Sequence, residues 1–267
     1  MPLAVCATPI GNLEDVSLRV LRELADAEVV VCEDTRRTRV LLERHGISAR
    51  LLSYHEHNEA ERTAELMPRL EAGEHVALVS DAGLPGISDP GTRLVAAALE
   101  AGVPVTVLPG PSAVETALVA SGFPAERYQF VGYLPRGAAA LDALWEELLG
   151  WRWPVVAFES PQRIPATLRS LARTQPGRRV AVCRELTKKF EEVVRGFAPE
   201  VARAFPEAPK GEITLVLDAW AGEGPDEDAG SAAVAELVVA GVPRRQAAEL
   251  VSRLTGASRN ALYRGSL

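Results

Sequence analysis

The sequence contains few cysteines and few aromatic residues, and it has no long apolar run. Three cysteines, Cys6, Cys32 and Cys183, are spread over 267 residues, and none belongs to a CxxC pair. Sparse cysteines in apolar segments are typical of free thiols in a reducing cytoplasm. No stretch reaches the roughly 18 apolar residues of a membrane span, and there is no signal-peptide pattern. We therefore expect a cytoplasmic protein without a membrane anchor.

The usual phosphate-binding motifs and the nucleophile motif of many hydrolases are also missing. There is no GxGxxG that opens a helix, no GxxxxGK[ST] and no GxSxG nucleophile elbow. With 29 Lys and Arg against 36 Asp and Glu, the net charge of −7 argues against binding nucleic acid through the overall field. A local basic patch is still compatible with this charge. The hydrophobic share of 47% is ordinary for a globular protein.

The first 111 residues alternate between short apolar segments and helical patterns. The apolar segments are residues 3–7, 28–32, 50–54, 75–79 and 103–108. Helical spacing of apolar residues occurs at 18–27, 61–70 and 93–101. Continuous Val, Leu and Ile runs separated by helices predict a mainly parallel sheet that is covered on both faces. We assign residues 1–111 to an N-terminal α/β domain.

Residues 112–221 predict a second α/β domain with a mixed sheet. Strands are expected at 129–133, 155–159, 180–185, 191–196 and 212–217, and helices at 113–121, 138–149, 163–174 and 199–204. The strands that begin at residues 180 and 191 are close enough in sequence to form an antiparallel hairpin. The overall prediction is therefore an α/β fold with two domains.

Residues 222–267 predict a linker and a small helical module. The segment 222–230 is rich in glycine and acidic residues, and residues 231–267 hold three short helical patterns. The module carries five arginines and two glutamates, which gives it a net charge of +3. A basic module of this kind resembles a helix-turn-helix. Contact with nucleic acid and a role in dimerisation or capping are both open.

The turns at the strand ends hold the residues that could bind a ligand or take part in a reaction. In an open parallel sheet, ligands bind beyond the carboxyl ends of the strands. The longest of these turns, residues 80–91, carries Asp81 and Asp89. Carboxylates would repel a phosphate, but they suit ribose hydroxyls or a positively charged ligand. S-adenosylmethionine has both ribose hydroxyls and positive charge. The alternative is that residues 80–91 form an ordinary rigid βα loop that binds no ligand.

Two other groups are candidates for a site. His55 and His57 would lie on the same side of an extended segment, but no third ligand is evident and we predict no metal site. The segment from Glu33 to Arg36 fits the N-terminal cap of a helix, with Asp34 or Thr35 as the cap, and equally fits contact with substrate.

Several motifs together resemble one known family. The motifs are Thr8–Leu13, Glu33–Arg36, His57–Glu59, Ser80–Gly83 with Ile87–Gly91, Pro109–Pro111, Glu159–Pro161, Arg184–Lys188, Lys210–Glu212 and Asn260–Tyr263. As an ordered set they closely resemble the small-subunit ribosomal RNA methyltransferase I family. These are 2′-O-ribose methyltransferases in the tetrapyrrole-methylase-like group of S-adenosylmethionine enzymes. The resemblance runs from Leu3 to Tyr263.

The resemblance implies a fold, a cofactor and a substrate. It implies two α/β domains with S-adenosylmethionine in the cleft between them, a homodimer, and a decoding-region cytidine of small-subunit ribosomal RNA, or of the assembled 30S particle, as the target. Positions that match the cofactor cleft of this group are Pro9, Asp81, Ala82, Leu84, Ile87, Ser112, Ala113 and Phe158. Leu84 and Gly86 depart from the family loop, which usually has Thr and a bulkier residue there. Gln162 replaces a frequent His.

Methyl transfer to a ribose hydroxyl needs alignment and a proton acceptor. Lys188 is our candidate base, provided that its pKa is lowered by burial or by a neighbouring cation. Glu33 and Asp34 are alternative bases. Contacts with substrate are predicted for Arg36, as a phosphate ligand, and for His57, Asn58 and Arg184.

Two other functions remain open at this point. One is a methyltransferase of the same fold that acts on a tetrapyrrole precursor. The other is a non-catalytic regulator that binds nucleic acid through the C-terminal module. The basic module argues against the first, since a small anionic macrocycle does not need it. The many strand-end turns argue against the second.

Overall fold

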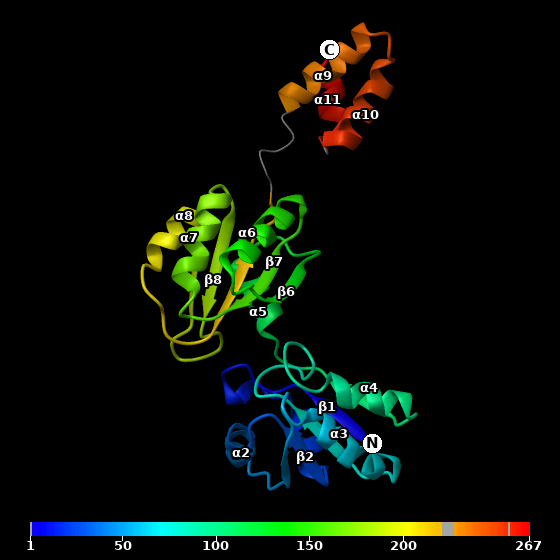
Figure 1. Cartoon of the computed structure of the whole chain (residues 1–267), viewed down its shortest axis with the longest axis vertical. Coiled ribbons are helices and arrows are strands. Elements are labelled where there is room, and N and C mark those ends of the chain that lie inside the picture. Colours follow the sequence, from blue (N-terminus) through cyan, green and yellow to red (C-terminus); the bar gives the residue numbers. More distant parts are fainter. Residues whose placement is uncertain (1, 221–226, 256) are drawn as a thin grey trace.

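Two five-stranded sheets and a small helical unit follow one another along the chain (Figure 1). The structure is a computed structural model that describes residues 2–220, 227–255 and 257–267. In Figure 1 the first sheet lies at the bottom, the second in the middle and the helical unit at the top. The predicted α/β fold with two domains and a helical C-terminal part is confirmed.

The first sheet is entirely parallel, with the order β3-β2-β4-β1-β5. Its strands are β1 (Leu3–Cys6), β2 (Val29–Cys32), β3 (Leu51–Ser53), β4 (Val76–Val79) and β5 (Val105–Leu108). Every residue of β1, β2 and β4 is buried, because these apolar runs lie between two layers of helices. The helices α1 (Leu18–Asp26) and α2 (Thr35–Arg44) pack on one face. The helices α3 (Glu59–Glu71) and α4 (Thr92–Glu100) pack on the other.

The second sheet is mixed, with the order β6-β7-β10-β8-β9. Its strands are β6 (Gln129–Tyr133), β7 (Val155–Glu159), β8 (Arg179–Arg184), β9 (Glu192–Phe197) and β10 (Ile213–Leu217). The predicted antiparallel hairpin is confirmed as β8 and β9. Among the described strand pairs of this sheet, β6 with β7 is parallel and the others are antiparallel. The helices α6 (Ala138–Glu147), α7 (Ile164–Thr174) and α8 (Ala198–Ala204) cover one face. The helix α5 (Ala113–Ser121) covers the other, together with Ile10 from the first domain.

The C-terminal unit consists of α9 (Glu227–Val239), α10 (Arg244–Thr255) and α11 (Arg259–Gly265). They pack on one another around a core of their own, which includes Val234, Val251 and Leu262. The helix α9 begins at Glu227, inside the segment that we predicted as a linker, and residues 222–226 of that linker lie outside the described residues. None of the helices in the described ranges is long and apolar enough to span a membrane.

All three cysteines are buried in strands and carry free thiols. Cys6 and Cys32 belong to the first sheet, and Cys183 belongs to the second. Burial raises the pKa of Cys6 and of Cys183 to about 12, and it also raises the pKa of Cys32. These thiols therefore stay protonated and unreactive in the folded protein.

Candidate active site

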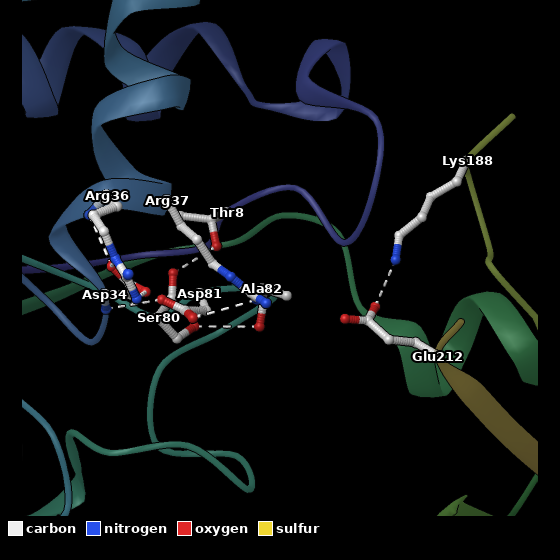
Figure 2. A network of polar contacts seen from close by, with 9 residues as sticks. All are labelled: Thr8, Asp34, Arg36, Arg37, Ser80, Asp81, Ala82, Lys188 and Glu212. Carbon is white, nitrogen blue, oxygen red and sulfur yellow. Dashed lines mark hydrogen bonds and ion pairs between the residues drawn. The ribbon is translucent and has the colours of Figure 1, made fainter. Parts of the chain in front are cut away.

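A cavity of about 300 Å³ lies where the strand ends of the first sheet meet the second domain. Most of its wall comes from the loop after β1, from α2 and from the loop after β4. Lys188 and Glu212 of the second domain lie across from these segments in Figure 2. The cavity therefore occupies the edge of the parallel sheet at which ligands are expected.

The loop after β4 is held in shape by a bridge to the loop after β1. The N–H of Thr8 donates to the carbonyl oxygen of Gly83 at 2.8 Å, and the N–H of Gly83 donates back to Thr8 at 3.0 Å. The hydroxyl of Thr8 also donates to the carbonyl oxygen of Ser80 at 3.1 Å. Gly83 has a φ of +78°, which residues with a Cβ rarely adopt. The bridge holds Asp81 and Ala82 at the cavity wall.

Asp81 connects the ends of two neighbouring strands. Its Oδ1 accepts a hydrogen bond from the backbone N–H of Asp34 at 3.0 Å, and its Oδ2 lies 3.3 Å from Nη1 of Arg37. Asp34 is the cap of α2, as one reading of the sequence predicted, because its Oδ1 accepts from the N–H of Arg36 at 2.9 Å. Hydrogen bonds from Arg36 also hold the pKa of Asp34 below its usual range. Figure 2 shows these side chains as one network.

Two more carboxylates near Asp81 are harder to ionise than usual. Burial first, and the negative charges of Glu33 and Asp81 next, raise the pKa of Asp89 to about 6. Burial and the charge of Asp81 also raise the pKa of Glu33. Three carboxylates therefore share one region at the strand ends. Such a region suits a cationic ligand, and it suits a proton acceptor that works near neutral pH.

Lys188 is held between two carboxylates. Its Nζ lies 2.9 Å from Oε1 of Glu185 and 2.9 Å from Oε2 of Glu212. Partial burial lowers its pKa, but the hydrogen bonds to Glu212 and Glu185 outweigh this, and the pKa is raised overall. Lys188 is therefore a stable cation. The role of Lys188 as a base required a lowered pKa, and its surroundings instead raise the pKa.

The turn that carries Lys188 lies directly against the loop after β1. The N–H of Asn12 donates to Oγ1 of Thr187 at 3.0 Å, and Thr187 has a φ of +65°. A Cβ on Gly11 would lie 2.6 Å from Cγ of Lys188 and 2.7 Å from the carbonyl oxygen of Leu186. Only a glycine lets the two backbones approach this closely. This contact closes one side of the cavity.

Of the residues predicted to bind the cofactor, three line the cavity: Pro9, Asp81 and Ala82. The other five do not line it: Leu84 and Ile87 lie in the loop after β4, Ser112 and Ala113 lie at the start of α5, and Phe158 lies in β7. Leu84 packs on the core of the first domain, and Ile87 is half exposed on the same loop. The hydroxyl of Ser112 donates to Glu115. Ala113 and Phe158 pack against the core of the second domain.

The residues predicted to contact substrate are spread more widely. Arg36 is exposed and ion-paired with Asp34. Asn58 shapes its own turn, since its Oδ1 accepts from the N–H of His55 at 2.8 Å, and the rings of His55 and His57 lie 6.0 Å apart. Arg184 lies in a separate groove on the second domain, where its Nε donates to Glu192 at 2.9 Å. The cavity brings together none of these four predicted residues, Arg36, His57, Asn58 and Arg184.

The part of the wall that comes from α2 was not predicted from the sequence. Arg37, Thr38 and Leu41 line the cavity, and so does Glu212 of the second domain. Arg37 directly follows the cap motif, so helical spacing from Asp34 was the signal that could have found these three residues. Within the described residues, no group of three or more His, Cys, Asp and Glu is arranged to hold a metal ion.

The fold and the cavity define a class of protein. The family profile described as Tetrapyrrole (Corrin/Porphyrin) Methylases matches residues 2–202. Among solved structures, the methyltransferase CobJ superimposes with a TM-score of 0.62 at 19% identity, covering 82% of this chain and 94% of that chain. Uroporphyrin-III C-methyl transferase from Thermus thermophilus, complexed with S-adenyl homocysteine, superimposes with a TM-score of 0.55 at 20% identity. The match covers 81% of this chain and 96% of that chain. The fold is that of the tetrapyrrole methylases.

Curated relatives narrow this class to one family. A protein of Mycobacterium tuberculosis named ribosomal RNA small subunit methyltransferase I is 45% identical, over 98% of this chain and 93% of its own length. The protein of the same name from Mesorhizobium japonicum is 42% identical, over 98% and 90%. The one from Thermotoga maritima is 44% identical, over 80% and 97%. The chain belongs to the ribosomal RNA small subunit methyltransferase I family, as the resemblance implied.

The chain is therefore a methyltransferase, and its cofactor is S-adenosylmethionine. The residues at the cavity fit this group. Asp81 and Glu212 place carboxylates at the wall, and both neighbouring cations, Arg37 and Lys188, are already paired with carboxylates. A donor with a sulfonium and an ammonium group therefore meets negative charge, whereas a polyphosphate would be repelled.

Proposed function

We propose that this chain transfers the methyl group of S-adenosylmethionine to the 2′-hydroxyl of a cytidine ribose in the decoding region of small-subunit ribosomal RNA. The names of the curated relatives support ribosomal RNA as the substrate class. The choice of cytidine and of the 2′-oxygen rests on the family resemblance. The observation that carries the proposal is the cavity at the strand ends, with the carboxylates of Asp81 and Glu212 in its wall.

The first task of the site is to hold the donor in line with the hydroxyl. When bound, S-adenosylmethionine supplies the methyl group and a neutral thioether as leaving group. We assign donor binding to Pro9, Asp81 and Ala82 at the cavity wall, with Leu84, Ile87, Ser112, Ala113 and Phe158 around it. The rigid bridge between the loops after β1 and β4 fixes Asp81 before the donor arrives. Such preorganisation is worth several kcal/mol of the barrier to transfer.

The second task is to accept the proton of the hydroxyl. Of the three predicted bases, Glu33 has a raised pKa, Asp34 has a lowered pKa, and Lys188 is a paired cation. A carboxylate with a raised pKa is the stronger proton acceptor, so Glu33 fits this role best. Asp89, whose pKa is about 6, lies close enough to interact with Glu33 and is a further acceptor. We assign Lys188 to charge balance against Glu185 and Glu212.

Contacts with RNA would come from basic side chains outside the cavity. Arg36 is exposed at the start of α2, and four arginines of the C-terminal unit, Arg245, Arg253, Arg259 and Arg264, are exposed as well. We assign these residues, together with His57, Asn58 and Arg184, to the RNA of the small subunit or the assembled 30S particle. The active form is proposed to be a cytoplasmic homodimer, which light scattering in solution can test.

One experiment separates this function from its alternatives. Labelled S-adenosylmethionine is incubated with the protein and with small subunits, with free ribosomal RNA, or with tetrapyrrole precursors. Label in the ribose of a single cytidine in small-subunit RNA is the expected result. Transfer to a tetrapyrrole alone would establish the alternative function that the solved neighbours perform. Binding of RNA without transfer to any of the three would establish a non-catalytic regulator.

A further inference from the structure

An exposed aromatic side chain stands at the end of the edge strand β6. The ring of Tyr133 is 67% exposed, although the ring that it contacts, that of Phe158, is partly buried against the core of the second domain. Exposure of a large ring has a cost in water that is recovered when another flat group covers it. Tyr133 therefore calls for an explanation in terms of binding.

A bulge in β6 directs this side chain. Phe130 pairs with Val156 and Tyr133 pairs with Phe158, so β6 has one residue more than β7 over this stretch. The extra residue is accommodated by Gly132, which has a φ of +66°. Bulges of this kind bend a strand and re-aim a side chain, often beside an active site. A Cβ on Gly132 would lie 4.0 Å from Oγ of Ser88, so the bulge rests on the loop after β4 of the first domain.

The ring is held from behind by an aromatic pair. Tyr133 and Phe158 meet edge to face with ring centroids 5.5 Å apart, and Phe158 and Phe130 do the same at 5.0 Å. Edge-to-face packing fixes the plane of a ring. The orientation of the Tyr133 ring is thus fixed, so a flat group can stack on it without a large loss of side-chain conformational entropy.

Tyr133 lies close enough to the carboxylates of the proposed active site to interact with their charges, and Gly132 beside it rests on Ser88, the neighbour of Asp89. Desolvation, and then the negative charges of Asp89, Glu212 and Glu33, raise the pKa of Tyr133. Glu33 directly follows β2, Asp89 lies in the loop after β4, and Glu212 lines the cavity. The ring therefore lies beside the carboxylates of the region to which we assign donor and proton acceptor.

We propose that Tyr133 is the platform on which the nucleobase of the target nucleotide stacks, in a binding subsite that turns its ribose toward the cavity. This inference rests on the proposed function. Bases in single-stranded RNA bind to exposed aromatic rings, because every base has a flat π face. A 2′-hydroxyl can be aligned with a donor only if the nucleotide is held on both sides of the ribose. Tyr133 holds the base, and the carboxylates near Asp81 meet the hydroxyl.

The test compares three substitutions in the full-length protein on small subunits. Tyr133→Phe keeps the ring and is expected to keep kcat/KM within about twofold. Tyr133→Ala and Tyr133→Leu remove the π face and are expected to lower kcat/KM by about 5- to 150-fold, the range that loss of one base–aromatic stack produces. The affinity for S-adenosylmethionine, measured by calorimetry, is expected to be unchanged in all three. Phe197→Ala, an exposed aromatic residue on β9, is the matched control and should behave as wild type.

Each other result overturns the inference. If Tyr133→Leu keeps full kcat/KM, bulk alone is enough and no base stacks there. If Tyr133→Ala loses affinity for S-adenosylmethionine, the ring covers the adenine of the donor instead. If thermal melting shows that Tyr133→Phe is unfolded, or that it loses kcat/KM with the fold intact, the hydroxyl and not the ring is what matters. If the wild-type protein itself does not methylate small subunits, the proposed function is wrong, and this result is distinct from any effect of the Tyr133 substitutions.

Discussion

The substitution Asp89→Asn is expected to stabilise the protein and to do so in a pH-dependent way. The pKa of Asp89 is raised from 3.8 to about 6 by burial and by the charges of Glu33 and Asp81. A shift of about two pKa units corresponds to about 3 kcal/mol of destabilisation of the ionised form. Asp89 is only partly buried, and solvent screens part of this cost. We therefore expect a gain of about 1 kcal/mol, or about 2–4 °C in melting temperature.

The sign of the pH dependence follows from the direction of the shift. Asp89 binds its proton more tightly when folded, so the wild-type protein is favoured while the group is protonated. This contribution is fully present below the unfolded pKa of 3.8 and is lost as the pH rises through about 6. The advantage of Asp89→Asn should consequently be largest above about pH 6 and should shrink steadily between about pH 6 and pH 4.

Thermal melting at a series of pH values measures this effect. Glu126→Gln, at an exposed position in the loop before β6, is the control for a general change in net charge. An equal gain for Asp89→Asn at all pH values, or a gain matched by the control, would refute the reasoning. Methyl transfer should fall in the stabilised variant, because a carboxylate that costs stability is expected where it serves the reaction.

Four further predictions concern the site and the C-terminal unit. Gly11→Ala should destabilise the protein by about 1–3 kcal/mol and weaken donor binding, because the added methyl group would push away the turn that carries Lys188. Gly177→Ala, which adds a methyl group in open space, is the control and should have the wild-type melting temperature. Equal melting temperatures for the two variants would count against the close contact at Gly11. Asp81→Ala should weaken S-adenosylmethionine about 10- to 100-fold in calorimetry, and unchanged affinity would remove Asp81 from the donor site. Lys188→Arg should keep most of the methyl transfer and Lys188→Ala should not; complete loss in the arginine variant would restore lysine as the base. Removal of residues 227–267 should lower affinity for small subunits and reduce the salt dependence by about 0.7–0.9 in slope for each lost phosphate contact, whereas an unchanged slope would assign the unit to assembly.

The fold was largely predictable because its strands are short, apolar and regularly interrupted. Runs such as residues 29–32 and 76–79 have no polar face, and only a sheet with helices on both sides accommodates them. The helix α2 was not predicted in full, although its cap Asp34 was. Its sequence is dominated by arginines, and only Leu41 and Leu42 mark an apolar face. The start of α9 was placed too late, because glycine and acidic residues there are typical of a linker.

The site was predictable at the level of loops and less so at the level of side chains. The rule for parallel sheets pointed to the turns after β1 and β4, and three residues of these turns, Pro9, Asp81 and Ala82, line the cavity. The rule contains no information on the second domain, so Glu212 received no role. The pairing of Lys188 with two carboxylates depends on the fold of the turn from Glu185 to Lys188. Two residues of this turn, Glu185 and Thr187, have positive φ angles that no periodic pattern shows.

The buried thiols give each sheet its own built-in reporter of opening. Cys6 and Cys32 lie in the first sheet and Cys183 lies in the second, and none can react while its strand is covered. Labelling with a thiol reagent, followed by mass spectrometry to identify the modified cysteine, would thus reveal which domain opens more readily. If the methyl donor binds in the cavity as proposed, its addition should slow labelling in both halves at once, because a ligand in contact with both domains would couple their opening.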